Sequence, residues 1–212
     1  MTTLFLKLSG YINILSGLLM LAFWYLYAIL LPYRQLSNTL SILVLNRNWT
    51  LVNVLGVSGS LLGLLGFSGL FFVQIEKIGR LGVIGFICAF LGASLLLGAL
   101  LWDTIIWPIL VQYDSSLLDF QGPIYSSKTF VPFFVSAGLV YSLGYILFGI
   151  ATAQAGVLPA WGGVMLAVGA PLFGLGAMFG SFQVITRSVG LTVFALGLIW
   201  LGYSILKITD GL

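Results

Sequence analysis

Thirteen charged residues divide this chain of 212 residues into long neutral tracts, and their spacing limits the fold more than any motif does. A helix needs roughly 20 apolar residues to cross a hydrocarbon core about 30 Å thick. Four of the neutral tracts have room for one such helix each, and the tract 129–186 has room for two. The neutral tracts cover residues 8–33, 48–75, 81–102, 129–186 and 188–206. The pattern therefore predicts an all-α, polytopic membrane bundle with six transmembrane helices, forming a single domain over residues 1–212.

Aromatic and proline residues at the ends of these tracts mark the membrane interfaces, as is typical of spanning helices. The expected spans cover about residues 10–32, 50–74, 81–107, 130–153, 159–180 and 185–206. We expect Pro108 to stop or kink the third span. Six spans place both termini on one side of the membrane. Lysines and arginines are divided evenly between the two sides, four on each, so two weaker cues decide. The tight basic turn 77–80 and the acidic connection 103–128 favour cytoplasmic termini.

The composition excludes several classes of protein. Charged residues make up 6% of the chain, against roughly 25% in a soluble domain, so a water-soluble fold is excluded. The basic residues are scattered, whereas nucleic-acid binding requires a clustered patch. The chain has no histidine and a single cysteine, Cys88, which removes the usual ligands of haem, zinc and iron. We therefore expect no metal and no cofactor.

Small residues recur at spacings of three and four in the second and third spans, which places them on one face of each helix. Close backbone approach through such stripes drives helix association in lipid. The pattern predicts that these two spans pack against each other as an antiparallel hairpin. The glycines that define the stripes are Gly56, Gly59, Gly63 and Gly66 in the second span, and Gly82, Gly85 and Gly92 in the third.

The fifth span carries Pro171 at mid-depth, which predicts a kink, because proline removes one backbone hydrogen bond. A helix broken there would expose carbonyl groups to a substrate. Trp49 and Trp161 precede glycine-rich helices, and Arg80 and Arg187 occupy corresponding places before the third and sixth spans. These matches indicate a weak 3+3 inverted repeat, an arrangement found in many secondary transporters.

Asp103 is the leading candidate for a functional polar residue. No carboxylate lies in the middle of a span, which counts against an ion-coupled pump. Asp103 lies near the end of the third span, at headgroup level, and Trp107 lies one helical turn later. We expect Asp103 to face Arg187 or Arg34 beneath the connection 104–128, where the pair could bind a lipid headgroup or line a substrate mouth. The simpler alternative is that these residues anchor the helix ends at the interface.

Two tyrosines of the fourth span form a second candidate. Tyr141 and Tyr145 share a helix face with Gly138 and Gly149, so they could line a small cavity. Hydrogen bonds between helices are the ordinary explanation for such residues. We find no nucleophile–base pair and no phosphate-binding glycine loop, so no catalytic residue is assigned.

Three segments resemble a broad group of small, uncharacterised multi-pass membrane proteins of bacteria. They are Trp49–Gly56, Gly79–Phe86 and the stretch from Trp102 to Pro108. The resemblance rests on glycine, tryptophan and apolar positions. It implies a bacterial inner membrane but no reaction, ligand or site.

Three functions remain open at this point. The first is a non-enzymatic accessory subunit or a module that binds lipid or another apolar molecule, since catalytic groups are lacking. The second is a small transporter or channel for a neutral solute, and the third is an intramembrane enzyme centred on Asp103. The expected partners are the lipid bilayer and either other membrane subunits or a bound lipid. We expect neither nucleic acid nor metal.

Overall fold

The computed structural model describes residues 2–32 and 39–211, and these residues are helical almost throughout. The described helices are α1 (Thr2–Leu30), α2 (Ser41–Val44), α3 (Trp49–Phe72), α4 (Gly79–Tyr113), η2 (Ser115–Leu118), α5 (Phe130–Ala155), α6 (Ala160–Gly174), η3 (Gly176–Phe182) and α7 (Gln183–Asp210). Here η denotes a 3₁₀ helix. The prediction of an all-α bundle is confirmed.

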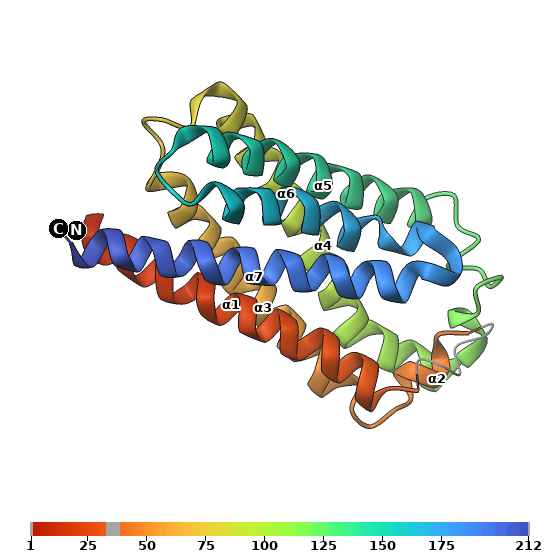
Figure 1. Cartoon of the computed structure of the whole chain (residues 1–212). Helices are drawn as coiled ribbons and strands as arrows, with labels where there is room; N and C mark the ends of the chain where they lie inside the picture. The colour runs from red at the N-terminus through yellow and green to blue at the C-terminus, as the bar shows by residue number, and fades with distance from the viewer. Residues whose placement is uncertain (1, 33–38, 212) are drawn as a thin grey trace.

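The long helices form a closed ring in chain order (Figure 1). Each of α1, α3, α4, α5 and α6 packs antiparallel against the next helix of the series, and α7 returns to pack along α1. The Lys7 ammonium and the Asp210 carboxylate form an ion pair of 2.7 Å, which joins the beginning of α1 to the end of α7. Both termini therefore lie at the same end of the ring.

Five of the described helices, α1, α3, α4, α5 and α7, are long and apolar enough to cross a membrane, which supports a multi-pass membrane protein. The sixth, α6, has 15 residues and falls short of that length. The expected helix over 159–180 gives way at Gly174 to the 3₁₀ helix η3. Pro171 cannot donate a backbone hydrogen bond, and the glycines after it favour helix poorly, so the α-helix ends there.

The α3 glycines face a different helix from the one we expected. An added Cβ at Gly56 would lie 2.9 Å from the Phe23 ring, and one at Gly63 would lie 2.9 Å from Ser16 Oγ. Gly59 and Gly66 likewise approach α1, so the stripe of α3 packs on α1 rather than on α4.

The α4 glycines also face a helix other than the one we expected. Gly85 and Gly92 lie against the backbone of Phe148 and Tyr141 on α5, while Gly82 contacts Ile78 just before its own helix. The second and third spans do pack against each other as the predicted antiparallel hairpin, but most of their stripe glycines do not form that contact. The spacing of small residues identifies a face of a helix, but in a ring each helix has two neighbours, and spacing does not choose between them.

The third expected span also continues further than predicted. α4 runs through Pro108 to Tyr113, and its 35 residues extend about 52 Å. Trp107 and Val111 are buried in a cluster with Leu43 and Leu118, so packing holds the last turns in place despite the proline. Of the two effects expected at Pro108, the stop does not occur for this reason, and the kink stays a prediction.

The two longer connections meet over the end of the ring opposite the termini. The Leu40 amide donates a hydrogen bond of 3.0 Å to the Leu118 carbonyl, and Thr39 pairs with Asp119 in an isolated bridge. We call residues 39–48 and 114–129 the cap. The cap covers the end of the ring at which α3, α5 and α7 begin.

Candidate functional site

The helices of the ring line a partly open cavity of about 810 Å³ in the half that lies next to the cap. This volume is within the range of roughly 300–1,000 Å³ that is typical of small-molecule sites. All six helices of the ring contribute to its wall, and so do residues of η3 and of the cap. Along α4 the lining residues extend from Ala93 to Trp107, which corresponds to about 21 Å of helix.

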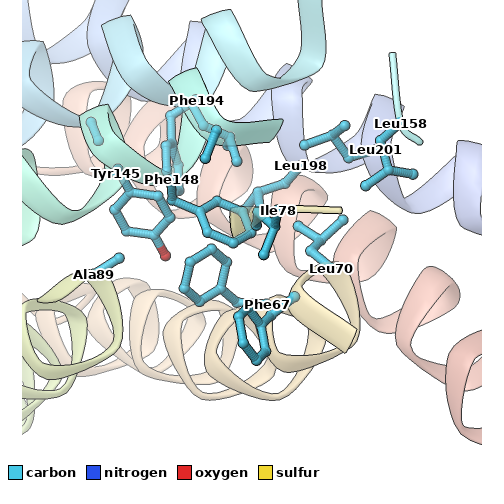
Figure 2. Packing of buried hydrophobic residues seen from close by; sticks show 14 of the residues in the cluster. Phe67, Leu70, Ile78, Ala89, Tyr145, Phe148, Leu158, Phe194, Leu198 and Leu201 are labelled. Carbon is cyan, nitrogen blue, oxygen red and sulfur yellow. The ribbon is translucent and has the colours of Figure 1, made fainter. Parts of the chain in front are cut away.

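The other half of the ring is filled by side chains, as Figure 2 shows. Phe67 of α3 packs on Phe148 of α5 with ring centroids 4.5 Å apart, and Leu201 of α7 is fully buried in the same cluster. Tyr145, Phe194 and Leu198 belong both to this cluster and to the cavity wall, so they form the floor of the cavity.

Asp103 lies on the wall near the cap and is held by two tryptophans. The Trp107 indole, one helical turn further along α4, donates a hydrogen bond to Asp103 Oδ1. The Trp49 indole at the start of α3 donates to the Asp103 carbonyl over 2.9 Å. The Asp103 carboxylate forms no direct ion pair with any described cation. Its side chain is therefore oriented by an indole rather than neutralised by a neighbouring charge.

Arg187 of α7 lines the cavity between two aromatic rings. Its guanidinium carbon is 4.9 Å from the centroid of Trp24 and 5.1 Å from that of Phe173, both favourable cation–π distances. The Trp24 indole is fixed in turn by a hydrogen bond of 2.7 Å to Ser188 Oγ. Arg187 and Asp103 thus line one cavity from different helices.

Tyr141 and Tyr145 of α5 line the deeper part of the cavity. Their side chains are only 5% and 4% exposed, and their rings lie 4.8 Å apart. Neither hydroxyl forms a hydrogen bond with another described residue. Asn53 of α3 also lines the wall. Its side-chain amide donates a hydrogen bond of 2.9 Å to the Trp49 carbonyl. The deep wall thus offers a few polar groups on an otherwise apolar surface.

Tyr125 brings the cap into the site. Its ring stacks on Trp107 at 6.5 Å and meets Phe130 edge-on at 5.6 Å. Burial raises the pKa of the Tyr125 hydroxyl above its ordinary value, and the nearby Asp103 charge raises it further. Tyr125 therefore stays protonated and can donate a hydrogen bond at neutral pH.

The structure gathers most of the candidate residues predicted from the sequence in one place. Asp103, Trp107, Arg187, Tyr141 and Tyr145 all line the cavity, whereas Arg34 lies outside the described residues. Pro171 lies on α6 two residues before Phe173, which lines the cavity, but is not itself a lining residue.

Sequence reasoning missed Trp24, Trp49, Asn53 and Tyr125 as parts of the site. Trp24 and Trp49 are aromatic residues at span ends, and such residues look alike in sequence whether they face lipid or the interior. Tyr125 lies in a connection that carries no helical periodicity. The one signal available was the cluster of aromatic residues near Asp103, which the belt at the membrane interface explains equally well.

No family model, curated protein or solved structure in the comparisons matches the chain. In the part of the chain that the structure describes, no group of three or more histidine, cysteine, aspartate or glutamate side chains could hold a metal ion. The ligand class of the site is therefore inferred from the residues that line it. The cavity offers a long apolar wall with one carboxylate and one guanidinium near its capped end.

Proposed function

We propose that this protein is a six-span membrane module that holds an amphiphilic, lipid-like molecule inside its ring of helices. The observation that carries the proposal is the polarity of the cavity, whose charged residues lie at the capped end and whose deeper wall is mainly apolar and aromatic. An apolar chain gains free energy from an apolar wall, and a polar head gains it from the charged groups. We take the role to be non-enzymatic, in keeping with a wall that is mainly apolar and aromatic.

The sixth span in this proposal combines α6 with η3. The 15 residues of α6 extend about 22 Å, and the first residues of η3 continue this span before the chain turns into α7. An even number of spans places both termini on one side, and the basic turn 77–80 on that side favours the cytoplasm. The resemblance to small bacterial membrane proteins favours a bacterial inner membrane.

The depth of the cavity supports a lipid-like ligand. A single leaflet contributes about half of the 30 Å core, or roughly 15 Å. The cavity extends about 21 Å along α4, enough for one leaflet and part of the headgroup layer. The tryptophans at its capped end suit the interface, where amphipathic rings are most stable.

A transporter or channel is less well supported for two reasons. The half of the ring next to the termini is filled by the buried cluster of Figure 2, which counts against a continuously open channel. The order of the helices also disfavours a 3+3 inverted repeat. Two halves related by a two-fold axis in the membrane plane would run around a ring in opposite senses, one clockwise and one anticlockwise. In this ring the three helices of the first half and the three helices of the second half follow one another in the same sense.

The test is to fill the cavity and to measure what the purified protein carries. Ala93 lines the cavity on α4, so Ala93→Phe places a phenyl ring in the space that the ligand would occupy. Ala28→Phe makes the same change at an exposed position of α1 that does not line the cavity. After gentle detergent extraction, native mass spectrometry should find a bound amphiphile on the wild type and on Ala28→Phe.

In Ala93→Phe the occupancy should fall by about tenfold, since losing about 1.4 kcal/mol of binding corresponds to that factor. Far-UV circular dichroism checks that all three proteins are equally folded. Equal occupancy in Ala93→Phe and Ala28→Phe would show that the bound molecules sit on the outside of the bundle, and the proposal would then fail.

A further inference from the structure

The cavity is open on one side, and the exposed residues of its wall show where the opening lies. Three described residues both line the cavity and are exposed, namely Val131 of α5 and Ala177 and Met178 of η3. Met178 is 65% exposed and Val131 is 41% exposed, whereas the other described lining residues are buried or partly buried. A residue that faces both the cavity and the outside lies at the rim of an opening. The cavity therefore opens between the start of α5 and η3, and we call the opening bordered by these three residues the lateral mouth.

The end of α6 explains why the helices separate at the lateral mouth. α5 and α6 pack closely as far as Gly138 and Gly174, since an added Cβ at Gly138 would lie 2.9 Å from the Gly174 carbonyl oxygen. Beyond Gly174 the α-helix gives way to η3, which packs along α7 and makes little contact with α5. An added Cβ at Gly176 of η3 would lie 3.3 Å from the Arg187 backbone nitrogen on α7. Residues 130–137 of α5 extend about 12 Å beyond the contact with α6, and the lateral mouth lies along them.

The lateral mouth faces lipid. Residues 129–186, which include both of its sides, carry no charge. Phe133 and Phe179, which are close in sequence to the rim residues, are 45% and 53% exposed, and such apolar surface is stable against lipid but costly in water. Leu40 and Tyr125 of the cap lie over the end of the cavity, and the buried cluster of Figure 2 fills the space beneath its floor. A molecule that enters through the lateral mouth therefore comes from the bilayer.

We propose that the ligand is a lipid of the leaflet on the capped side, and that it enters the cavity directly from the bilayer through the lateral mouth. Its chains stay in apolar surroundings on this route, because the rim and the deeper wall are both mainly apolar. Its head stays near the interface, because the lateral mouth lies at the capped end of the bundle. This inference rests on the proposed function and adds the source of the ligand, which is the bilayer rather than an amphiphile dissolved in water. Val131 and Ala177 then limit which molecules pass, since they border the opening from opposite sides.

The test narrows the lateral mouth and follows the entry of a lipid over time. Ala177→Trp places an indole at the rim, and Ala28→Trp makes the same change at an exposed position of α1 that does not line the cavity. Each protein is placed in nanodiscs of dioleoyl phosphatidylcholine. Donor vesicles then supply phosphatidylcholine with a photoreactive diazirine on one acyl chain. Samples are irradiated at increasing times, and the labelled residues are identified by peptide mass spectrometry.

Two helices provide internal standards for this labelling. On α5, Tyr145 lines the cavity and Leu143 is 56% exposed, and on α7, Leu198 lines the cavity and Leu196 is 44% exposed. Labelling of the two exposed leucines measures the arrival of the lipid in the nanodisc. Labelling of Tyr145 and Leu198 measures its entry into the cavity. The ratio of inner to outer labelling therefore separates entry from arrival.

In the wild type and in Ala28→Trp, the inner pair should be labelled soon after the outer pair. In Ala177→Trp, inner labelling should be at least about tenfold slower, which corresponds to about 1.4 kcal/mol added to the barrier, and outer labelling should be unchanged. Val131→Trp narrows the lateral mouth from α5 and should give the same delay. Inner labelling in both variants at the rate of the wild type would overturn the inference.

Far-UV circular dichroism checks the fold of each variant, and Met178→Ala is the further test if a tryptophan variant does not fold. Met178→Ala removes a long exposed side chain from the rim, so inner labelling should become faster. An unchanged rate in this variant would count against the inference.

A water-soluble analogue tests entry from the aqueous side. Dihexanoyl phosphatidylcholine with the same diazirine, used below its critical micelle concentration, should be delayed by Ala177→Trp as the long-chain lipid is. Inner labelling by the analogue at the same rate in Ala177→Trp and the wild type would show an entrance from water and would overturn the inference. Labelling of the outer pair alone in every protein, the wild type included, would show that the cavity holds no lipid. That result would refute the proposed function itself, so the two failures are distinguishable.

Discussion

The contact between α4 and α5 can be tested by adding a single methyl group. In Gly92→Ala, the new Cβ would lie 2.2 Å from the Tyr141 backbone nitrogen and 2.4 Å from its Cα, whereas ordinary contact begins near 3.4 Å. Backbone atoms cannot rotate out of the way as a side chain can. The two helices must therefore separate by roughly 1 Å along this seam.

The expected cost follows from two opposing effects. Overpacking destabilises a protein by about 1–3 kcal/mol, and a backbone obstacle places this site near the upper end. Alanine has a higher helix propensity than glycine, which offsets about 1 kcal/mol. The free energy of unfolding should thus fall by about 2 kcal/mol. Gly98→Ala is the matched control on the same helix, because an added Cβ there meets nothing within 4 Å. That variant should be as stable as the wild type or more stable, by up to about 1 kcal/mol.

The assay is unfolding by sodium dodecyl sulfate in mixed micelles, followed by far-UV circular dichroism, for the wild type and both variants. The two variants should differ in unfolding free energy by about 3 kcal/mol. If Gly92→Ala lies within about 0.5 kcal/mol of the wild type, the α4–α5 contact is not as close as described, and the ring order loses its main support.

Two further predictions concern buried and exposed polar groups. Asn13 donates hydrogen bonds to the Ser9 and Gly66 carbonyls, at 2.9 and 2.8 Å. Asn13→Ala should therefore lower the free energy of unfolding by about 1 kcal/mol in the same assay. An unchanged free energy of unfolding would show that the contact between α1 and α3 does not depend on these hydrogen bonds. The side chain and then the backbone amide of Ser116 lower the pKa of the Asp114 carboxyl through hydrogen bonding. The stabilising effect of Asp114 is therefore complete above the ordinary pKa of about 3.9 and is lost as the pH falls through the lower folded-state pKa. Hydrogen exchange of the amides in Ser115–Leu118 should accordingly be faster in Asp114→Ala than in the wild type at pH 7, with the difference in protection narrowing in acid; equal protection at pH 7 would contradict the cap.

Much of the architecture could be predicted because charged groups are so costly in lipid. Thirteen charges confined to a few short segments leave the chain little choice but to run as apolar helices between them. Helix ends were harder to predict, because packing decides them. α4 continues past Pro108 where Trp107 and Val111 are buried, and α6 ends at Gly174 although the neutral tract continues.

The partners of each helix face and the full site could not be predicted from one sequence. The stripe from Gly56 to Gly66 shows which face of α3 allows close backbone approach. Whether α1 or α4 packs on that face depends on how the ring closes. Asp103 and Arg187 could be selected because so few charges lie near a span. Trp24 and Tyr125 could not be selected, since aromatic residues at the interface are found both on the lipid-facing surface and in the interior of a bundle.

The central claim is that the ring encloses a bound molecule, and an experimental density map of the protein in native lipid tests it most directly. We expect elongated density within the cavity, beginning between Asp103 and Arg187 and extending along α4 to the level of Ala93. A cavity that holds only water, or one closed by contact between the helices with lipid confined to the outer surface, would contradict the claim.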